Sequence, residues 1–212
     1  MAPPVSDCEI RDPRIRRTRR LLQRALQDLL VEKSLEDILV QDITDAATVN
    51  RATFYDHYTD KYALFEAMVA GDFHALLAEK KIAFDGTCPG QLRAIVLAVC
   101  GYLERPHLHA CGGPSQGPFL PLMEAAITAS IRRTLLGGMP QVSGANPNPT
   151  RPVLSADVLA ITASWAIYSA VKEWYSSGRR LPAEQVAGPI AEAIHPILDA
   201  AFASGPSFAN RE

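Results

Sequence analysis

Two short helical segments with almost no chain between them constrain most strongly how this sequence can fold. We expect the first helix over Val40–Ala47 and the second over about Asn50–His57, a segment whose first residue is a good helix N-cap. Only Thr48 and Val49 then remain as the connection, so the pair has the form of a helix-turn-helix. The second helix is too short to be stable alone, and we expect Val49 and Phe54 to anchor it in a core.

Helical periodicity continues along the rest of the sequence, and no alternating run typical of a β-strand is found. Further helices are predicted over about 13–33, 61–84, 91–104, 119–136, 156–177 and 183–203, the first with Asp12 as its N-cap. Pro189 and Pro196 are expected to kink or interrupt the last helix. The sequence therefore predicts an all-α fold, with a three-helix domain over residues 1–60 and a larger helical domain over residues 61–212.

Charge is distributed unevenly along the chain. The formal net charge of −2 gives no sign of nucleic-acid binding. Near the N-terminus, however, a single acid, Asp12, stands against a run of arginines: Arg11, Arg14, Arg16, Arg17, Arg19, Arg20 and Arg24. This run is either a basic patch that attracts a polyanion or a solvated helix face.

The composition is that of a globular protein, with 48% hydrophobic and 21% charged residues. No apolar run approaches the roughly 18 residues that span a bilayer, and Met1–Arg20 lacks the apolar core of a signal peptide, so we expect a cytoplasmic protein without a membrane partner. No two cysteines have CxxC spacing, which favours free thiols. The sequence has no P-loop, no Rossmann glycine fingerprint and no G-x-S-x-G elbow, so we do not expect an enzyme.

The stretch from Ile38 to Phe65 reads ILVQDITDAATVNRATFYDHYTDKYALF, and it resembles the helix-turn-helix of the TetR family of bacterial regulators. The matching positions carry Ile43, Ala46, Val49, Thr53, Phe54, Tyr55, His57, Tyr58, Lys61 and Leu64. Three positions depart from the family pattern: Leu39, Thr44 and Thr48 stand where a helix-capping Ser or Thr, an Ala and a Gly are usual. The resemblance covers about the first 70 residues and implies an N-terminal DNA-binding domain.

In a helix-turn-helix the second helix enters the major groove of DNA with its first residues near the base edges. Arg51 could pair with guanine O6 and N7, and Ala52 and the Thr53 methyl group could meet a thymine methyl group. Gln41 and Thr44, near the start of the first helix of the pair, could reach the groove edge or the DNA backbone.

The resemblance assigns phosphate contacts to Tyr55, His57 and Lys61. Each of these residues has an alternative role. Tyr55 and its neighbour Tyr58 could be core aromatics, Lys61 could be a solvated lysine in a first helical turn, and His57 could be either exposed or packed. Asp60 opposes phosphate binding, so we expect it to point away from DNA or to cap the helix that follows.

Beyond about residue 85, the resemblance implies an all-helical domain that encloses an inducer pocket and dimerises through its last two helices. The predicted helix 156–177 agrees, because it has one apolar stripe with Trp165 and Tyr168 and another with Ile167 and Trp174. The candidates for lining the pocket combine apolar bulk with a few polar tips: Tyr102, Met123, Ile127, Trp165 and Tyr168. For each of them, ordinary core packing is the alternative.

His107, His109 and Cys111, with Cys100 nearby, could form a metal- or thiol-sensing site. The His-x-His-x-Cys spacing is unusual for a compact zinc site, and no second cluster completes it. We therefore expect no metal and no cofactor.

Together these features predict a ligand-responsive transcription regulator. In this interpretation a homodimeric repressor is released from a palindromic double-stranded operator by a small apolar or amphipathic inducer. Two alternatives stay open at the level of sequence. One is a helical ligand-binding or interaction protein without DNA-binding activity, and the other is a metal- or thiol-sensing regulator.

Overall fold

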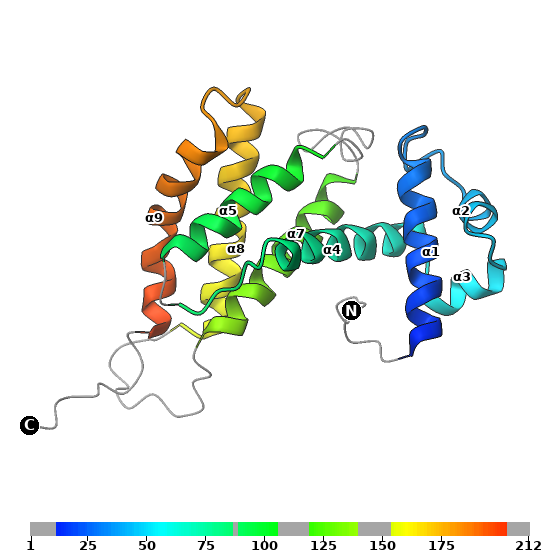
Figure 1. Cartoon of the computed structure of the whole chain (residues 1–212), viewed down its shortest axis with the longest axis horizontal. Helices are drawn as coiled ribbons and strands as arrows, with labels where there is room; N and C mark the ends of the chain where they lie inside the picture. The colour runs from blue at the N-terminus through cyan, green and yellow to red at the C-terminus, as the bar shows by residue number, and fades with distance from the viewer. Residues whose placement is uncertain (1–11, 87–88, 106–118, 140–153, 203–212) are drawn as a thin grey trace, which may run out of the picture. The chain divides into compact units, whose positions relative to one another are not determined.

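The structure is a computed structural model, and it describes residues 12–86, 89–105, 119–139 and 154–202. Within those ranges all regular elements are helical (Figure 1): α1 (Pro13–Leu29), α2 (Val40–Ala47), α3 (Arg51–His57), α4 (Lys61–Glu79), α5 (Pro89–Leu103), α7 (Leu120–Gly138), α8 (Ala156–Ser176) and α9 (Ala183–Phe202). The all-α prediction is confirmed. In the same ranges, no helix is long and apolar enough to cross a membrane.

The chain divides into two compact units. The first contains Met1–Leu76 and Gly101–Ile127, and the second contains Leu77–Cys100 and Thr128–Glu212. Three helices, α4, α5 and α7, therefore run from one unit into the other. This division does not follow the sequence-based boundary after residue 60, because the first unit also takes in most of α4.

In the first unit, α1 packs against α2 and α3 (Figure 1). The carboxylate of Asp12 caps α1 by accepting a hydrogen bond from the Arg14 backbone N–H at 2.8 Å, as predicted. The face of α1 turned to the core carries Leu22 and Leu26, which are both fully buried. The helix ends at Leu29, earlier than the predicted end near residue 33.

The turn between α2 and α3 has the predicted length, and both helices have the predicted bounds. Thr48 adopts a left-handed backbone conformation, with φ of 55° and ψ of 45°. The turn is closed by hydrogen bonds from the Val49 N–H to the Thr44 carbonyl at 3.0 Å and from the Thr48 N–H to the Asp45 carbonyl at 3.1 Å. A β-branched residue is strained in this conformation, whereas glycine adopts it freely.

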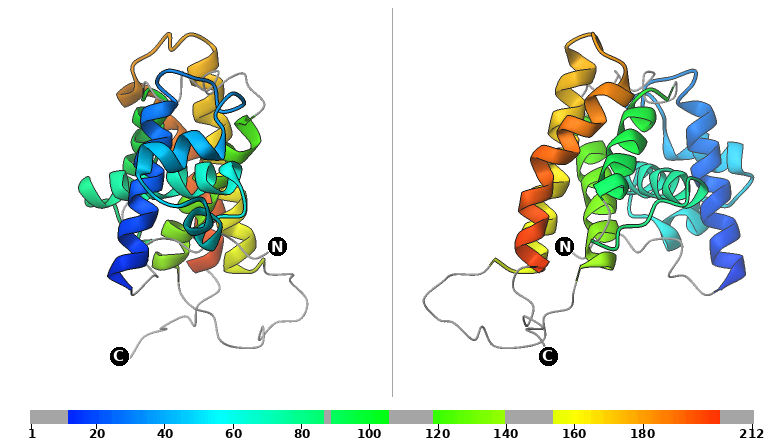
Figure 2. Two further views of the ribbon diagram at one scale, coloured as in Figure 1. Left: turned by 90° about the vertical axis from the view of Figure 1, so that its right-hand side faces the viewer. Right: turned by 60° about the vertical axis from the view of Figure 1, so that its left-hand side comes forward.

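In the second unit, α8 and α9 pack side by side (Figure 2). The indole N–H of Trp174 donates to the Leu181 carbonyl at 2.9 Å and so fastens the turn that joins them. The helix α9 is continuous through Pro189 and Pro196, so of the two predicted effects, a kink or an interruption, the interruption was wrong. Both prolines lie on the exposed face, where a carbonyl that loses its helical partner is accessible to water.

The end of α4 also differs from the prediction. The helix ends at Glu79 rather than near residue 84. Lys81 takes a left-handed conformation with φ of 52°, and the Ile82 N–H turns back to the Leu77 carbonyl at 2.9 Å. The apolar pattern that suggested a longer helix continues because Phe84 is buried from a non-helical segment.

Candidate nucleic-acid interface

The helix α3 presents one face to the core and the opposite face to solvent. Phe54 is fully buried and anchors the helix as predicted. Arg51, Ala52 and Tyr55 are exposed, while Thr53 and His57 are half-buried. The helix starts at a well-made cap, since the side-chain oxygen of Asn50 accepts a hydrogen bond from the Ala52 N–H at 2.8 Å.

Arg51 and Tyr55 interact on this exposed face. A guanidinium N–H of Arg51 donates to the Tyr55 hydroxyl at 3.3 Å, and the guanidinium carbon lies 5.7 Å from the centre of the tyrosine ring. The ring of Tyr55 meets the ring of Phe54 edge-on, with centroids 5.3 Å apart. Tyr55 is 47% exposed, so it is not the core aromatic that one sequence interpretation allowed.

Tyr58 is the core aromatic of this segment. Its side chain is 5% exposed, and the Arg19 guanidinium lies over its ring at 4.7 Å from the centroid. The Gln23 side-chain amide of α1 donates to the Tyr58 hydroxyl at 3.1 Å. Arg19 is therefore packed in the core, although it belongs to the basic run of α1. Other arginines of that run are exposed: Arg14, Arg17, Arg20 and Arg24.

The two candidates on α2 differ in accessibility. Gln41 is exposed, and its amide donates to the Asp45 carboxylate at 2.7 Å. Thr44 is only 1% exposed, and its hydroxyl donates to the Gln41 carbonyl at 3.0 Å within the same helix. The structure therefore argues against direct DNA contact by Thr44, because periodicity turns this residue toward the core. Ala46, one of the positions that match the family pattern, is exposed.

The N-terminus of α2 is capped by a side chain of the same helix. Leu39 has no side-chain acceptor, but the Asp42 carboxylate accepts a hydrogen bond from the Leu39 backbone N–H at 2.9 Å. This is one half of a capping box. The leucine side chain itself is 63% exposed.

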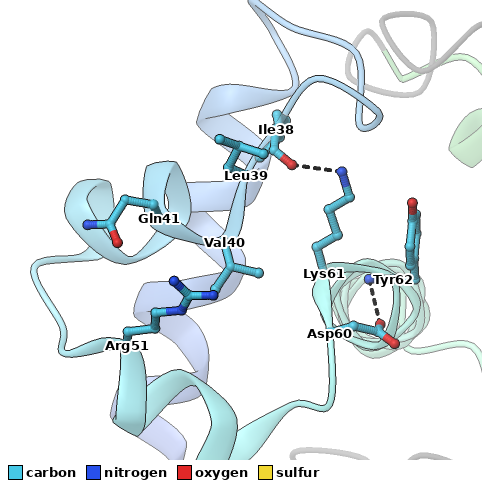
Figure 3. Close-up of a pocket in the computed structure, with 8 residues that line it drawn as sticks. All are labelled: Ile38, Leu39, Val40, Gln41, Arg51, Asp60, Lys61 and Tyr62. Atoms are coloured by element: carbon cyan, nitrogen blue, oxygen red, sulfur yellow. Dashed lines mark hydrogen bonds between the residues drawn. The ribbon is translucent and has the colours of Figure 1, made fainter.

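Lys61 makes contacts within the protein that the sequence interpretation did not include. Its ammonium group donates to the carbonyls of Glu36 and Ile38, each at 2.8 Å, and so ties the start of α4 to the loop between α1 and α2 (Figure 3). Asp60 caps the same helix by accepting from the backbone N–H groups of Tyr62 and Ala63 at 2.9 Å and 2.8 Å. The capping role expected for Asp60 is found, whereas two donors of Lys61 are already engaged with the protein.

A surface hollow of about 400 Å³ lies where the starts of α2, α3 and α4 come together (Figure 3). It brings together three of the predicted DNA-contacting residues, Gln41, Arg51 and Lys61, and adds apolar side chains that the sequence interpretation missed. The Arg51 side chain extends toward Val40 at the start of α2, and Tyr62 stands on the opposite side of the hollow (Figure 3). The complete lining is Ile38, Leu39, Val40, Gln41, Arg51, Asp60, Lys61 and Tyr62.

Tyr62 also makes a contact that local sequence could not reveal. Its ring stacks on Phe119, just before α7, with centroids 5.6 Å apart and planes 24° from parallel.

Farther along α4, the Gln27 amide of α1 donates to the Asp72 carboxylate at 3.4 Å. Burial raises the pKa of Asp72, and the nearby Arg105 opposes that rise.

The predicted ligand-lining residues do not share one environment. In the first unit, Tyr102 and Ile127 are fully buried and Met123 is 4% exposed. In the second unit, Tyr168 is 1% exposed but Trp165 is 45% exposed, so the two aromatics of the predicted stripe do not line the same interior.

The metal-sensing alternative falls mostly outside the described residues, which do not include His107, His109 or Cys111. Cys100 is described and buried. Among the residues the structure describes, no cluster of histidine, cysteine and carboxylate side chains could hold a metal ion.

Comparison with known proteins agrees with this geometry. Residues 22–68 match the family model of bacterial regulatory proteins, tetR family. Over 59 residues the chain is 46% identical to the uncharacterized HTH-type transcriptional regulator YxbF of Bacillus subtilis strain 168, a match that covers 27% of this chain and 16% of that protein.

Solved structures resemble the chain over a greater length. A crystal structure of a protein designated a transcriptional regulator, from Pseudomonas aeruginosa PAO1, has a TM-score of 0.51 at 20% identity and covers 92% of this chain and 95% of its own. A TetR transcriptional regulator from Streptococcus agalactiae 2603V has a TM-score of 0.49 at 19% identity, over 88% of this chain and 98% of its own. At such identities the first likeness shows a shared fold.

The helix pair α2–α3, its tight turn and the exposed face of α3 define a helix-turn-helix domain. Over residues 22–68, this N-terminal domain is similar to the tetR family of bacterial regulatory proteins.

Proposed function

We propose that this chain is a transcriptional regulator that binds double-stranded operator DNA with α3. The observation that carries the proposal is the geometry of that helix, which exposes Arg51, Ala52 and Tyr55 while Phe54 is fully buried. An α-helix with its side chains is about 10–12 Å across, which fits a major groove about 12 Å wide. The match of residues 22–68 to the tetR family supports the same conclusion.

Each contact follows from the chemistry of its side chain. Arg51 pairs with guanine O6 and N7, and Ala52 and the Thr53 methyl group meet thymine methyl groups. Tyr55 and His57 lie farther along α3 and approach phosphates, and Gln41 reaches the groove edge or the backbone from α2. The exposed arginines of α1 supply the sequence-independent attraction to flanking phosphates.

We further propose that the protein acts as a homodimer. An exposed apolar row runs along α8 and the residues before it, with Leu154 57%, Val158 43%, Ile161 42% and Trp165 45% exposed. Their spacing places them on one face of the helix, and such a contiguous row is typical of an interface. A second copy related by a two-fold axis would cover this apolar row. The two helix-turn-helix domains of the dimer would then match the two halves of a palindromic operator.

The regulatory part of the proposal is a repressor that a small apolar or amphipathic molecule releases from DNA. Residues 1–60 are the DNA-binding part, and residues 61–212 bind the inducer and dimerise. In the first unit, Tyr102, Met123 and Ile127 remain candidates for the pocket, because they combine buried apolar bulk with a phenol group. In the second unit, the buried Tyr168 remains a candidate. Release requires that the inducer bind one of two conformations more tightly than the other.

Binding titrations with the DNA upstream of the protein's own gene test the proposal. The parent should bind this duplex more tightly than a scrambled duplex of equal length. Arg51→Ala should weaken operator binding by about 1–3 kcal/mol and relax the preference at one base pair. Arg180→Ala is the control, because it removes an exposed arginine from the second unit. Equal binding of both duplexes by the parent would instead favour a helical interaction protein without DNA-binding activity.

A further inference from the structure

We propose that Tyr55 is a positioning residue for Arg51, holding the guanidinium group in the orientation that reads a base. The proposal rests on the proposed DNA-binding function and adds a specificity role to a residue for which only a phosphate contact was expected. The two residues stand one helical turn apart on the exposed face of α3, at i and i+4.

The contact between them has two parts. The Arg51 guanidinium donates to the Tyr55 hydroxyl oxygen at 3.3 Å, and its carbon lies 5.7 Å from the ring centre. The hydrogen bond restrains the distance and direction of the Arg51 guanidinium group. The ring restrains the same group by the attraction of a cation to an aromatic ring. Both act on a side chain that would otherwise sample many rotamers.

The tyrosine is itself held by the core. Its ring packs edge-on against Phe54, at an interplanar angle of 84°, and Phe54 is fully buried. The start of α3 is fastened by the Asn50 cap, so the backbone of Arg51 is also fixed. A chain of contacts therefore leads from the core through Phe54 and Tyr55 to the guanidinium group.

This arrangement bears on base reading, because guanine O6 and N7 accept two hydrogen bonds from a planar fork in a defined orientation. A guanidinium group that is already oriented loses less conformational freedom on binding. The hydroxyl of Tyr55 accepts from Arg51 and keeps its own proton, so a phosphate contact from the same hydroxyl remains compatible with the positioning role.

A double-mutant cycle separates positioning from a phosphate contact. Tyr55→Phe, Arg51→Ala and the double variant are titrated with the operator, with operators changed at single base pairs, and with scrambled DNA. We expect Tyr55→Phe to lower the ratio of operator to scrambled affinity about 2- to 10-fold and to have almost no further effect in the Arg51→Ala background. Tyr55→Leu, which also removes the ring, should lower the ratio further.

Tyr175→Phe is the matched control, because Tyr175 lies in the second unit beneath the guanidinium of Arg179, 5.0 Å from the ring centre. Circular dichroism confirms that each variant folds. The inference is overturned if Tyr55→Phe weakens all duplexes by one factor and does so equally without Arg51. In that outcome the proposed function stands, whereas a parent protein without preference for the operator would overturn the proposed function itself.

Discussion

Replacing Lys61 by alanine tests whether this residue holds the domain together or contacts DNA from outside. Its ammonium group donates to two carbonyls, those of Glu36 and Ile38, at 2.8 Å each. A hydrogen bond from a charged donor contributes about 1.5–3 kcal/mol when buried. One of these bonds is exposed and the other half-buried, so screening by solvent leaves a sum of about 1–3 kcal/mol.

The expected result is a loss of stability that precedes any loss of DNA binding. For a chain of this size each kcal/mol corresponds to about 2–4 °C, so Lys61→Ala should melt about 2–12 °C below the parent. Thermal unfolding followed by circular dichroism measures the shift. Lys80→Ala is the control, because Lys80 is an exposed lysine just beyond the end of α4 and its loss changes the net charge equally.

A different pair of results would refute this reasoning. If Lys61→Ala melts with the parent, while the dependence of DNA affinity on salt falls by about one counterion per subunit, the ammonium group acts on a phosphate. The two carbonyl contacts would then contribute nothing to the folded state. Titrations over a range of salt, on operator and scrambled duplexes, supply the second measurement.

Three further predictions concern the rest of the chain. Gly138→Ala should lower stability by about 1–3 kcal/mol in denaturant titrations, because a Cβ there would clash with the Phe84 carbonyl oxygen. Gly137→Ala is the control, because its Cβ meets nothing within 4 Å and the change should be neutral or stabilising. Trp165→Glu should give a folded monomer in sedimentation experiments, and a stable dimer would exclude the α8 row as the interface. Burial raises the pKa of Asp72 above its usual 3.8. The contribution of Asp72 to the free energy of unfolding therefore falls as the pH rises from 3.8 through the raised pKa. In the variant Asp72→Asn this fall in stability should be absent.

Local signals explain why the caps and the bounds of the helix-turn-helix could be predicted from the sequence. The caps of α1, α3 and α4 are made by Asp12, Asn50 and Asp60, and each carboxylate or amide acts on a backbone N–H two or three residues away. Such contacts depend on a few neighbouring residues, which the sequence displays together. The bounds of α2 and α3 and the left-handed strain at Thr48 follow from the same local chemistry.

Periodicity alone does not show which side of a helix meets the core. This explains why the predicted surroundings of Trp165 and Thr44 differ from those in the structure. Trp165 and Tyr168 lie on neighbouring parts of one apolar stripe, yet Trp165 is 45% and Tyr168 only 1% exposed. The edge of the buried face falls between them, and its place depends on helices distant in sequence. Thr44 was misplaced for the same reason, and the stacking of Tyr62 on Phe119 depends on a contact between segments far apart in the chain.

The cations of the first unit divide into two groups once their contacts are known. Lys61 is bound to loop carbonyls and Arg19 packs over the ring of Tyr58, so both act within the fold. The exposed cations lie on α1, at Lys33 in the loop that follows it and at the start of α3. In the proposed function, the sequence-independent attraction to phosphates comes mainly from α1, where Arg14, Arg17, Arg20 and Arg24 are exposed, and base discrimination comes from Arg51. We therefore expect substitutions on α1 to change the salt dependence of binding and substitutions at Arg51 to change the preference for the operator.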